Sequence, residues 1–79
     1  MGHSMDWRER IAVEPDKRSG KACVRGTRIA VADILSYLAA GETEASLLKE
    51  FPQLKAEDIR AALAYAADGE RHTKLLAAE

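Results

Sequence analysis

Apolar residues recur at helical spacing over the second half of the chain and alternate with polar residues over part of the first third. Four of them follow the i, i+3, i+4, i+7 spacing of one helix face: Val31, Ile34, Leu35 and Leu38. Gly41 stands where a left-handed C-terminal cap is expected. The pattern predicts a first helix that begins at Val31.

A second helix is predicted between Thr43 and Pro52. Thr43 is a favourable N-cap residue, and an apolar face follows it, made by Leu47, Leu48 and Phe51. The helix should end before Pro52, because a proline disfavours the helical conformation of the residue that precedes it.

A third helix is predicted to begin within residues 55–58 and to bury a stripe made by Ile59, Ala62, Leu63 and Ala66. Gly69 is expected to end or interrupt this helix, and residues 72–76 to continue it as a tail. The side chains expected to point outward are Lys55, Glu57, Asp58, Arg60, Ala61, Ala64 and Tyr65.

Two short strands are predicted before the helices. Residues 10–14 alternate polar and apolar side chains until Pro15 stops the pattern, and residues 21–25 form a second candidate that ends at Gly26. Two such strands are not stable alone. They must pack on the helices or pair with strands of another copy, and both alternatives stay open.

The predicted fold is mainly α, with a three-helix core containing a helix-turn-helix, short N-terminal strands and a helical C-terminal tail. We expect residues 1–5 to be a cloning remnant, 6–30 an extended segment, 31–69 the helical core and 70–79 the tail. The core is expected to close around Pro52 through Leu47, Leu48, Leu54, Ile59 and Leu63.

A chain of 79 residues has a small core and usually needs additional support. Cys23 is the single cysteine, so no internal disulfide can form, and no cluster of Cys and His predicts a metal site or another cofactor. We therefore expect a homodimer.

Basic side chains concentrate in the first part of the chain. Residues 1–30 carry seven Lys and Arg against four acids, whereas residues 31–79 carry five against nine. A near-zero total charge argues against a strongly basic nucleic-acid binder, and Glu57 and Asp58 would repel phosphates at the start of the third helix. Contact with DNA phosphates is therefore expected mainly from the N-terminal segment, and the candidate residues are Lys17, Arg18, Lys21, Arg25 and Arg28, together with Lys55 and Arg60.

The string from Gly26 to Ile29 is the most distinctive local feature. Gly26 can adopt a positive φ, and Thr27 can bond backbone groups of the same turn. We favour a structural role for Arg28, which would tie the loop to a helix carboxylate such as Asp33 or Glu57; contact with phosphate is the alternative.

The sequence does not predict an enzyme. Cys23 is more typical of a buried apolar residue than of a nucleophile, and His3 and His72 belong to no catalytic motif. No apolar run is long enough to span a membrane, and we expect a cytoplasmic protein. Leu75 and Leu76 are expected either to bind a partner or to belong to a frayed helix end.

Residues 20–31, GKACVRGTRIAV, closely resemble the opening motif of the bacterial family known as domain of unknown function 433. The resemblance continues through residues 38–42, 51–54 and 57–65 and covers roughly residues 7–70. The family commonly has proline where this chain has Ala22 and Ala30, and a proline at position 30 would pre-set the backbone near the first helix.

The resemblance implies a homeodomain-like helix-turn-helix. It also implies an antitoxin, encoded beside a ribonuclease toxin with a PIN-like fold, that regulates its own operator DNA. The alternative is a dimeric protein-interaction module that does not bind DNA, which the acidic start of the third helix favours.

Overall fold

The computed structural model describes the backbone of residues 6–77 and the side chains of residues 6–69. Its elements in chain order are the 3-10 turn η1 (Trp7–Glu9), strand β1 (Ile11–Val13), turn η2 (Arg18–Gly20), strand β2 (Ala22–Val24) and helices α1 (Val31–Ala39), α2 (Glu44–Glu50) and α3 (Ala56–Ala77). The predicted fold is confirmed: it is mainly helical, with a helix-turn-helix core and short N-terminal strands.

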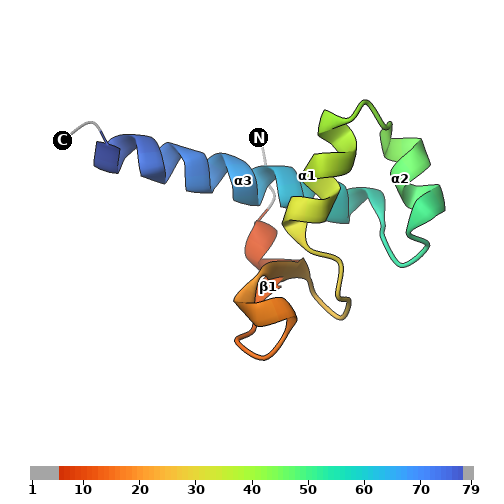
Figure 1. Ribbon diagram of the computed structural model, residues 1–79, viewed down its shortest axis with the longest axis horizontal. Coiled ribbons are helices and arrows are strands. Elements are labelled where there is room, and N and C mark those ends of the chain that lie inside the picture. The colour runs from red at the N-terminus through yellow and green to blue at the C-terminus, as the bar shows by residue number, and fades with distance from the viewer. Residues whose placement is uncertain (1–5, 78–79) are drawn as a thin grey trace.

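The elements gather around the first half of α3 (Figure 1). Helix α1 lies across that half, and α2 lies to the right of α1 in this view. The N-terminal segment with η1 and the hairpin, coloured red to orange, lies below α3. The second half of α3 extends past every other labelled element (Figure 1). The helix therefore belongs to the compact core at its start and projects from it at its end.

The two strands form an antiparallel pair within one chain. Ile11 lies opposite Val24, Ala12 opposite Cys23, and Val13 opposite Ala22. The other edge of β2 is covered by the segment that enters α1, because the Val24 N–H donates to the Ile29 carbonyl at 3.0 Å. In this structure the two strands therefore pair with each other and with a segment of the same chain.

The predicted C-terminal end of the first helix and the predicted N-terminal start of the second are confirmed. Gly41 has a φ of 97°, in the region that favours glycine, and its N–H donates to the Leu38 carbonyl at 3.0 Å. Thr43 caps α2, since its hydroxyl oxygen accepts a hydrogen bond from the Ser46 N–H at 3.0 Å. The chain therefore turns sharply between α1 and α2.

The core joins residues from all three helices and from the hairpin. Ile34 and Leu47 are among its most fully buried side chains, and the aromatic rings of Tyr37 and Phe51 meet edge to face beside it. The buried cluster comprises Ile11, Val24, Ile29, Val31, Ile34, Leu47, Leu54, Ile59, Ala61 and Ala62. Leu48 packs against this cluster and is partly buried.

The predicted orientation of α3 is wrong at three positions. Leu63 was expected inside but is 46% exposed, whereas Asp58 and Ala61 were expected outside and are buried. The reason is that α3 packs against α1 and α2 and also against η1 and β1. Two sides of the helix are covered, small alanines fill the close contacts, and Leu63 faces the side that remains open. The helix also continues through Gly69 without a break.

Replacing Leu47 with alanine should destabilise the protein by about 2–5 kcal/mol, because it removes a fully buried side chain and leaves a cavity. Leu63→Ala removes the same atoms from an exposed position and should change the free energy of unfolding by less than about 1 kcal/mol. Chemical denaturation followed by circular dichroism measures both values. Equal losses would contradict the burial described above.

Candidate functional site

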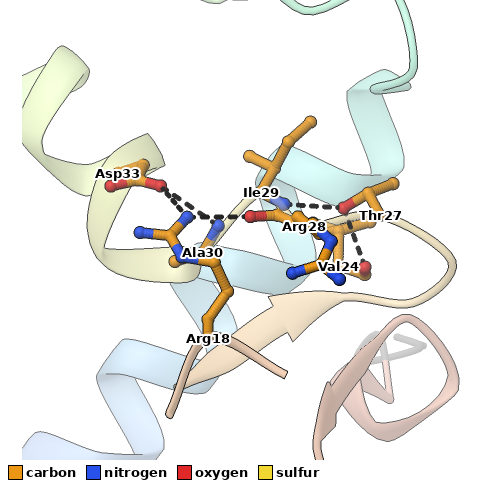
Figure 2. Close-up of polar contacts among 7 residues, drawn as sticks. All are labelled: Arg18, Val24, Thr27, Arg28, Ile29, Ala30 and Asp33. Carbon is orange, nitrogen blue, oxygen red and sulfur yellow. Dashed lines mark hydrogen bonds and ion pairs between the residues drawn. The ribbon is translucent and has the colours of Figure 1, made fainter. Parts of the chain in front are cut away.

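The loop between β2 and α1 is fixed by its own side chains. The Thr27 hydroxyl donates to the Val24 carbonyl at 2.9 Å and accepts from the Ile29 N–H at 3.0 Å (Figure 2). Gly26 has a φ of 77°, which a residue with a Cβ rarely adopts. Both expectations for this turn are confirmed, and the loop holds Arg25 and Arg28 in exposed positions.

Arg18, and not Arg28, ties this loop to a helix carboxylate. One terminal nitrogen of Arg18 donates to the Arg28 carbonyl at 2.9 Å and to the Asp33 carboxylate at 3.1 Å (Figure 2). Asp33 in turn accepts from the Ala30 N–H at the start of α1, at 3.3 Å. The structural role predicted for Arg28 is therefore wrong, and within the described part of the chain its guanidinium makes no hydrogen bond or ion pair.

The backbone of η2 explains why Arg18 reaches that position. Arg18 and Ser19 have φ values of 50° and 59°, and Gly20 follows with 81°. A left-handed conformation costs roughly 1–2 kcal/mol for a residue with a Cβ. The turn reverses the chain toward α1, where the bonds of the Arg18 side chain offset part of that cost.

A hollow of about 240 Å³ lies where this loop meets the start of α3. The loop contributes Arg25 and Thr27, and the turn between α2 and α3 contributes Gln53 and Lys55. The remaining lining residues are Glu9, Arg10, Val24 and Asp58. Three cations from separate parts of the sequence, Arg10, Arg25 and Lys55, thus border one depression beside the first turn of a long helix.

Asp58 organises the floor of this hollow. Its carboxylate accepts a charge-assisted hydrogen bond from Arg10 at 3.0 Å and a second bond from the Lys55 N–H at 2.9 Å. The second bond is the reciprocal half of a capping box, in which an acid in the first turn satisfies the N-cap amide. Because Asp58 and Arg10 neutralise each other, Arg25 and Lys55 carry the positive charge that is open to a ligand, and the exposed carboxylate of Glu9 is the one remaining negative charge of the lining.

Arg25 is oriented by the backbone of η1. Its Nε and one terminal nitrogen donate to the Arg8 carbonyl at 3.2 and 2.9 Å. A guanidinium has further N–H donors, and the side chain is exposed. Lys55 is also exposed, at the N-cap position of α3. The arrangement is suited to an anionic oxygen, such as that of a phosphate or a carboxylate.

The family model described as "Protein of unknown function (DUF433)" matches residues 11–66. The chain belongs to this family. The match includes both the loop that carries Arg25 and Arg28 and the turn that carries Gln53 and Lys55.

The DUF433 chain is similar to two bacterial proteins. It is similar to the uncharacterized protein y4eO of Sinorhizobium fredii, with 42% identity over 59 residues, which cover 75% of this chain and 27% of that protein. It is also similar in structure to a DUF433 member protein from Anabaena variabilis, with a TM-score of 0.75 and 31% identity over 89% of this chain and 69% of the other. The chain thus spans about a quarter of the rhizobial relative.

The candidate DNA-binding residues of the DUF433 chain fall into four groups. Arg25 and Lys55 border the hollow, whereas Arg28 and Arg60 are exposed outside its lining. Lys17 and Arg18 are engaged within the loop region: the Lys17 amine lies 3.5 Å from the Glu14 carboxylate and donates to the Thr27 carbonyl at 3.3 Å. Lys21 lines a different hollow. The side chains of Leu75 and Leu76 lie outside the described residues.

Sequence reasoning missed Arg10 and Gln53 as lining residues of the hollow. Gln53 could have been found, because it lies directly before the recognition helix, whose N-terminal residues contact base edges. Arg10 could not, since its role depends on the packing of β1 against α3. Cys23 is buried, as expected for a small apolar residue.

Two further features bear on the class of site. In the described part of the chain, no group of His, Cys, Asp and Glu side chains is placed to hold a metal ion. No helix among those residues is long and apolar enough to cross a bilayer.

Arg18→Ala should destabilise the protein by about 1 kcal/mol, because it removes partly exposed hydrogen bonds to Asp33 and to the Arg28 carbonyl. Arg28→Ala deletes an equal charge from an exposed side chain and should change stability by less than about 0.5 kcal/mol. Urea unfolding of both variants compares the two arginines. A larger loss for Arg28→Ala would mean that the roles assigned to them are reversed.

Proposed function

We propose that this protein is a homodimeric, antitoxin-like regulator that binds operator DNA and a PIN-like ribonuclease toxin. The DNA part rests on one observation: Arg25 and Lys55 border a single hollow at the start of α3, the helix in the recognition position of the helix-turn-helix. The toxin part rests on the family resemblance.

The electrostatics of the hollow favour a DNA phosphate as its ligand. Arg25 offers planar N–H donors, and Lys55 offers a flexible ammonium group at the N-terminal end of the α3 dipole, which favours an anion. Arg28 lies three residues from Arg25 on the same fixed loop and has a guanidinium with no partner among the described residues. Contacts of this kind set affinity and orientation on a duplex.

Direct reading of bases is expected to be limited. Glu57 is exposed in the first turn of α3 and repels phosphates nearby, and Asp58 is occupied by Arg10 and by the helix cap. Gln53 and Arg60 are the exposed side chains near the helix start that suit base edges. Affinity should therefore depend strongly on salt and modestly on sequence.

The proposed toxin contact uses a different part of the chain. The second half of α3 projects beyond the other elements, where a partner can approach it from several sides (Figure 1). Residues 31–79 carry nine acids against five bases, which complements a basic ribonuclease. Leu75 and Leu76 are proposed as apolar contacts on this part of the helix.

A dimeric interaction module without DNA binding is the second candidate. Its support is the acidity of the first turn of α3, where Glu57 faces solvent and Arg10 is already neutralised by Asp58. In that case the hollow would receive a carboxylate from a protein partner.

The double variant Arg25→Ala/Lys55→Ala should weaken binding to a duplex of the gene's own promoter region. In the homodimer, loss of two phosphate contacts per subunit, four in all, should reduce the slope of log K against log salt by about 3.6, since each contact contributes roughly 0.9. Fluorescence anisotropy from 50 to 300 mM salt measures the slope.

The matched control is Lys49→Ala, which removes an exposed cation from α2, away from the hollow. It should leave the slope unchanged within error. Equal effects of the control and the double variant, or no DNA binding at the lowest salt, would contradict the DNA function and favour the interaction module.

A further inference from the structure

The turn η1 packs against α3 and is held there at two points. At the start of the turn, the Trp7 indole N–H donates to the Asp68 carboxylate at 2.6 Å. Just past its end, the Arg10 guanidinium donates to the Asp58 carboxylate at 3.0 Å. The two acids are ten residues apart, which corresponds to roughly 15 Å along a continuous helix. The Arg8 carbonyl therefore lies, in sequence, between two fixed points.

The Trp7 side chain is contacted by three groups. Besides the bond to Asp68, the Tyr65 ring meets the indole edge to face, with the ring centroids 4.8 Å apart. The Arg8 guanidinium carbon lies 4.6 Å from the centroid of the Trp7 ring, as in a cation–π contact. A single helical turn is not stable on its own. The position of η1 on α3 therefore depends on the contacts of this one side chain.

The direction of the Arg25 guanidinium depends on where η1 lies. Its Nε and one terminal nitrogen both donate to the Arg8 carbonyl, at 3.2 and 2.9 Å. The backbone of Arg25 is fixed separately, because its N–H donates to the Arg10 carbonyl at 2.8 Å. With one edge of the guanidinium occupied, the edge formed by the two terminal nitrogens remains. That edge suits two oxygens of a phosphate.

We propose that Trp7 is a positioning residue for the phosphate contact of Arg25 and acts through the Arg8 carbonyl. The inference deepens the DNA contact of the proposed function and rests on it. Trp7 and Asp68 do not line the hollow. They hold the carbonyl that keeps Arg25 ordered before a ligand arrives, which removes the loss of side-chain freedom that binding would otherwise cause.

A positioning role differs from a purely structural one in its dependence on Arg25. A ring that only stabilises the fold affects binding whether or not Arg25 is present, whereas a positioning ring affects binding only through that side chain. The chain offers a matched control, because Tyr37 and Phe51 form a second edge-to-face pair, with centroids 5.3 Å apart. Neither ring lines the hollow. Tyr37→Ala thus breaks one aromatic pair, as Trp7→Ala breaks the other.

The first measurement needs no DNA: NMR gives the rate at which the Arg25 Nε proton exchanges with water. Exchange should be about fivefold faster in Trp7→Ala than in the unmodified chain, because the bond to the Arg8 carbonyl opens more often. Trp7→Phe keeps an aromatic ring, folds if Trp7→Ala does not, and should raise the rate about twofold. Tyr37→Ala should leave the rate unchanged. Circular dichroism checks that each variant stays helical.

The second measurement is binding to the promoter duplex by anisotropy. In the homodimer, Trp7→Ala should weaken binding about tenfold, or roughly threefold for each arginine that is no longer ordered. The same change made in Arg25→Ala should have an effect below about twofold, since no guanidinium is left to position. Tyr37→Ala should change affinity by less than about twofold in either background.

An unchanged exchange rate in both Trp7 variants, an equal loss of affinity with and without the Arg25 side chain, or an equal effect of Tyr37→Ala would overturn the inference. Absence of duplex binding at every salt concentration would contradict the DNA function instead. Faster exchange in that case would still show that Trp7 orders Arg25, so the two failures are distinguishable.

Discussion

The buried carboxylate of Asp58 is the point on which the arrangement of this small domain depends. It accepts bonds from Arg10, next to the first strand, and from the amide that begins α3. A buried charge is tolerated only when its lone pairs are satisfied, so these two partners must be present together. That requirement holds the N-terminal segment and the start of α3 in one position relative to each other, and the hollow between Arg25 and Lys55 is a consequence.

Two other long-range contacts fix the N-terminal third of the chain. The Trp7 indole N–H donates to the Asp68 carboxylate at 2.6 Å, and its ring packs edge to face against Tyr65 at 4.8 Å. Arg18 joins the hairpin loop to the first turn of α1 through Asp33. Strands of three residues are too short to be stable alone, and these contacts explain why they form within a single chain.

Sequence periodicity was sufficient to predict the elements but not the side of α3 that faces the core. Spacing of Val31, Ile34 and Leu38, the Thr43 cap and the Gly41 turn are local signals, and each has a local physical cause. An alanine-rich helix gives a weak signal for orientation, because alanine is compatible with a close contact and with solvent alike. Leu63 was therefore placed inside and Ala61 outside, and the structure reverses both.

The candidate site was predictable in its composition and not in its geometry. Arg25 and Lys55 were both identifiable as candidate phosphate-binding cations, yet thirty residues separate them in sequence and only the packing of β1 on α3 brings them to one hollow. Sequence reasoning also assigned the contact with Asp33 to Arg28, whereas Arg18 makes it. It depends on the left-handed backbone at Arg18 and Ser19, for which neither residue type provides a signal.

A double-mutant cycle on Arg10 and Asp58 tests most directly whether this pair joins the hairpin to α3. Urea unfolding of Arg10→Met, Asp58→Asn and the double variant gives the coupling free energy between the two side chains. A coupling of about 1–2 kcal/mol is expected for a hydrogen-bonded pair with one buried partner. Additive effects, with a coupling below about 0.3 kcal/mol, would show that the two elements are held together without it.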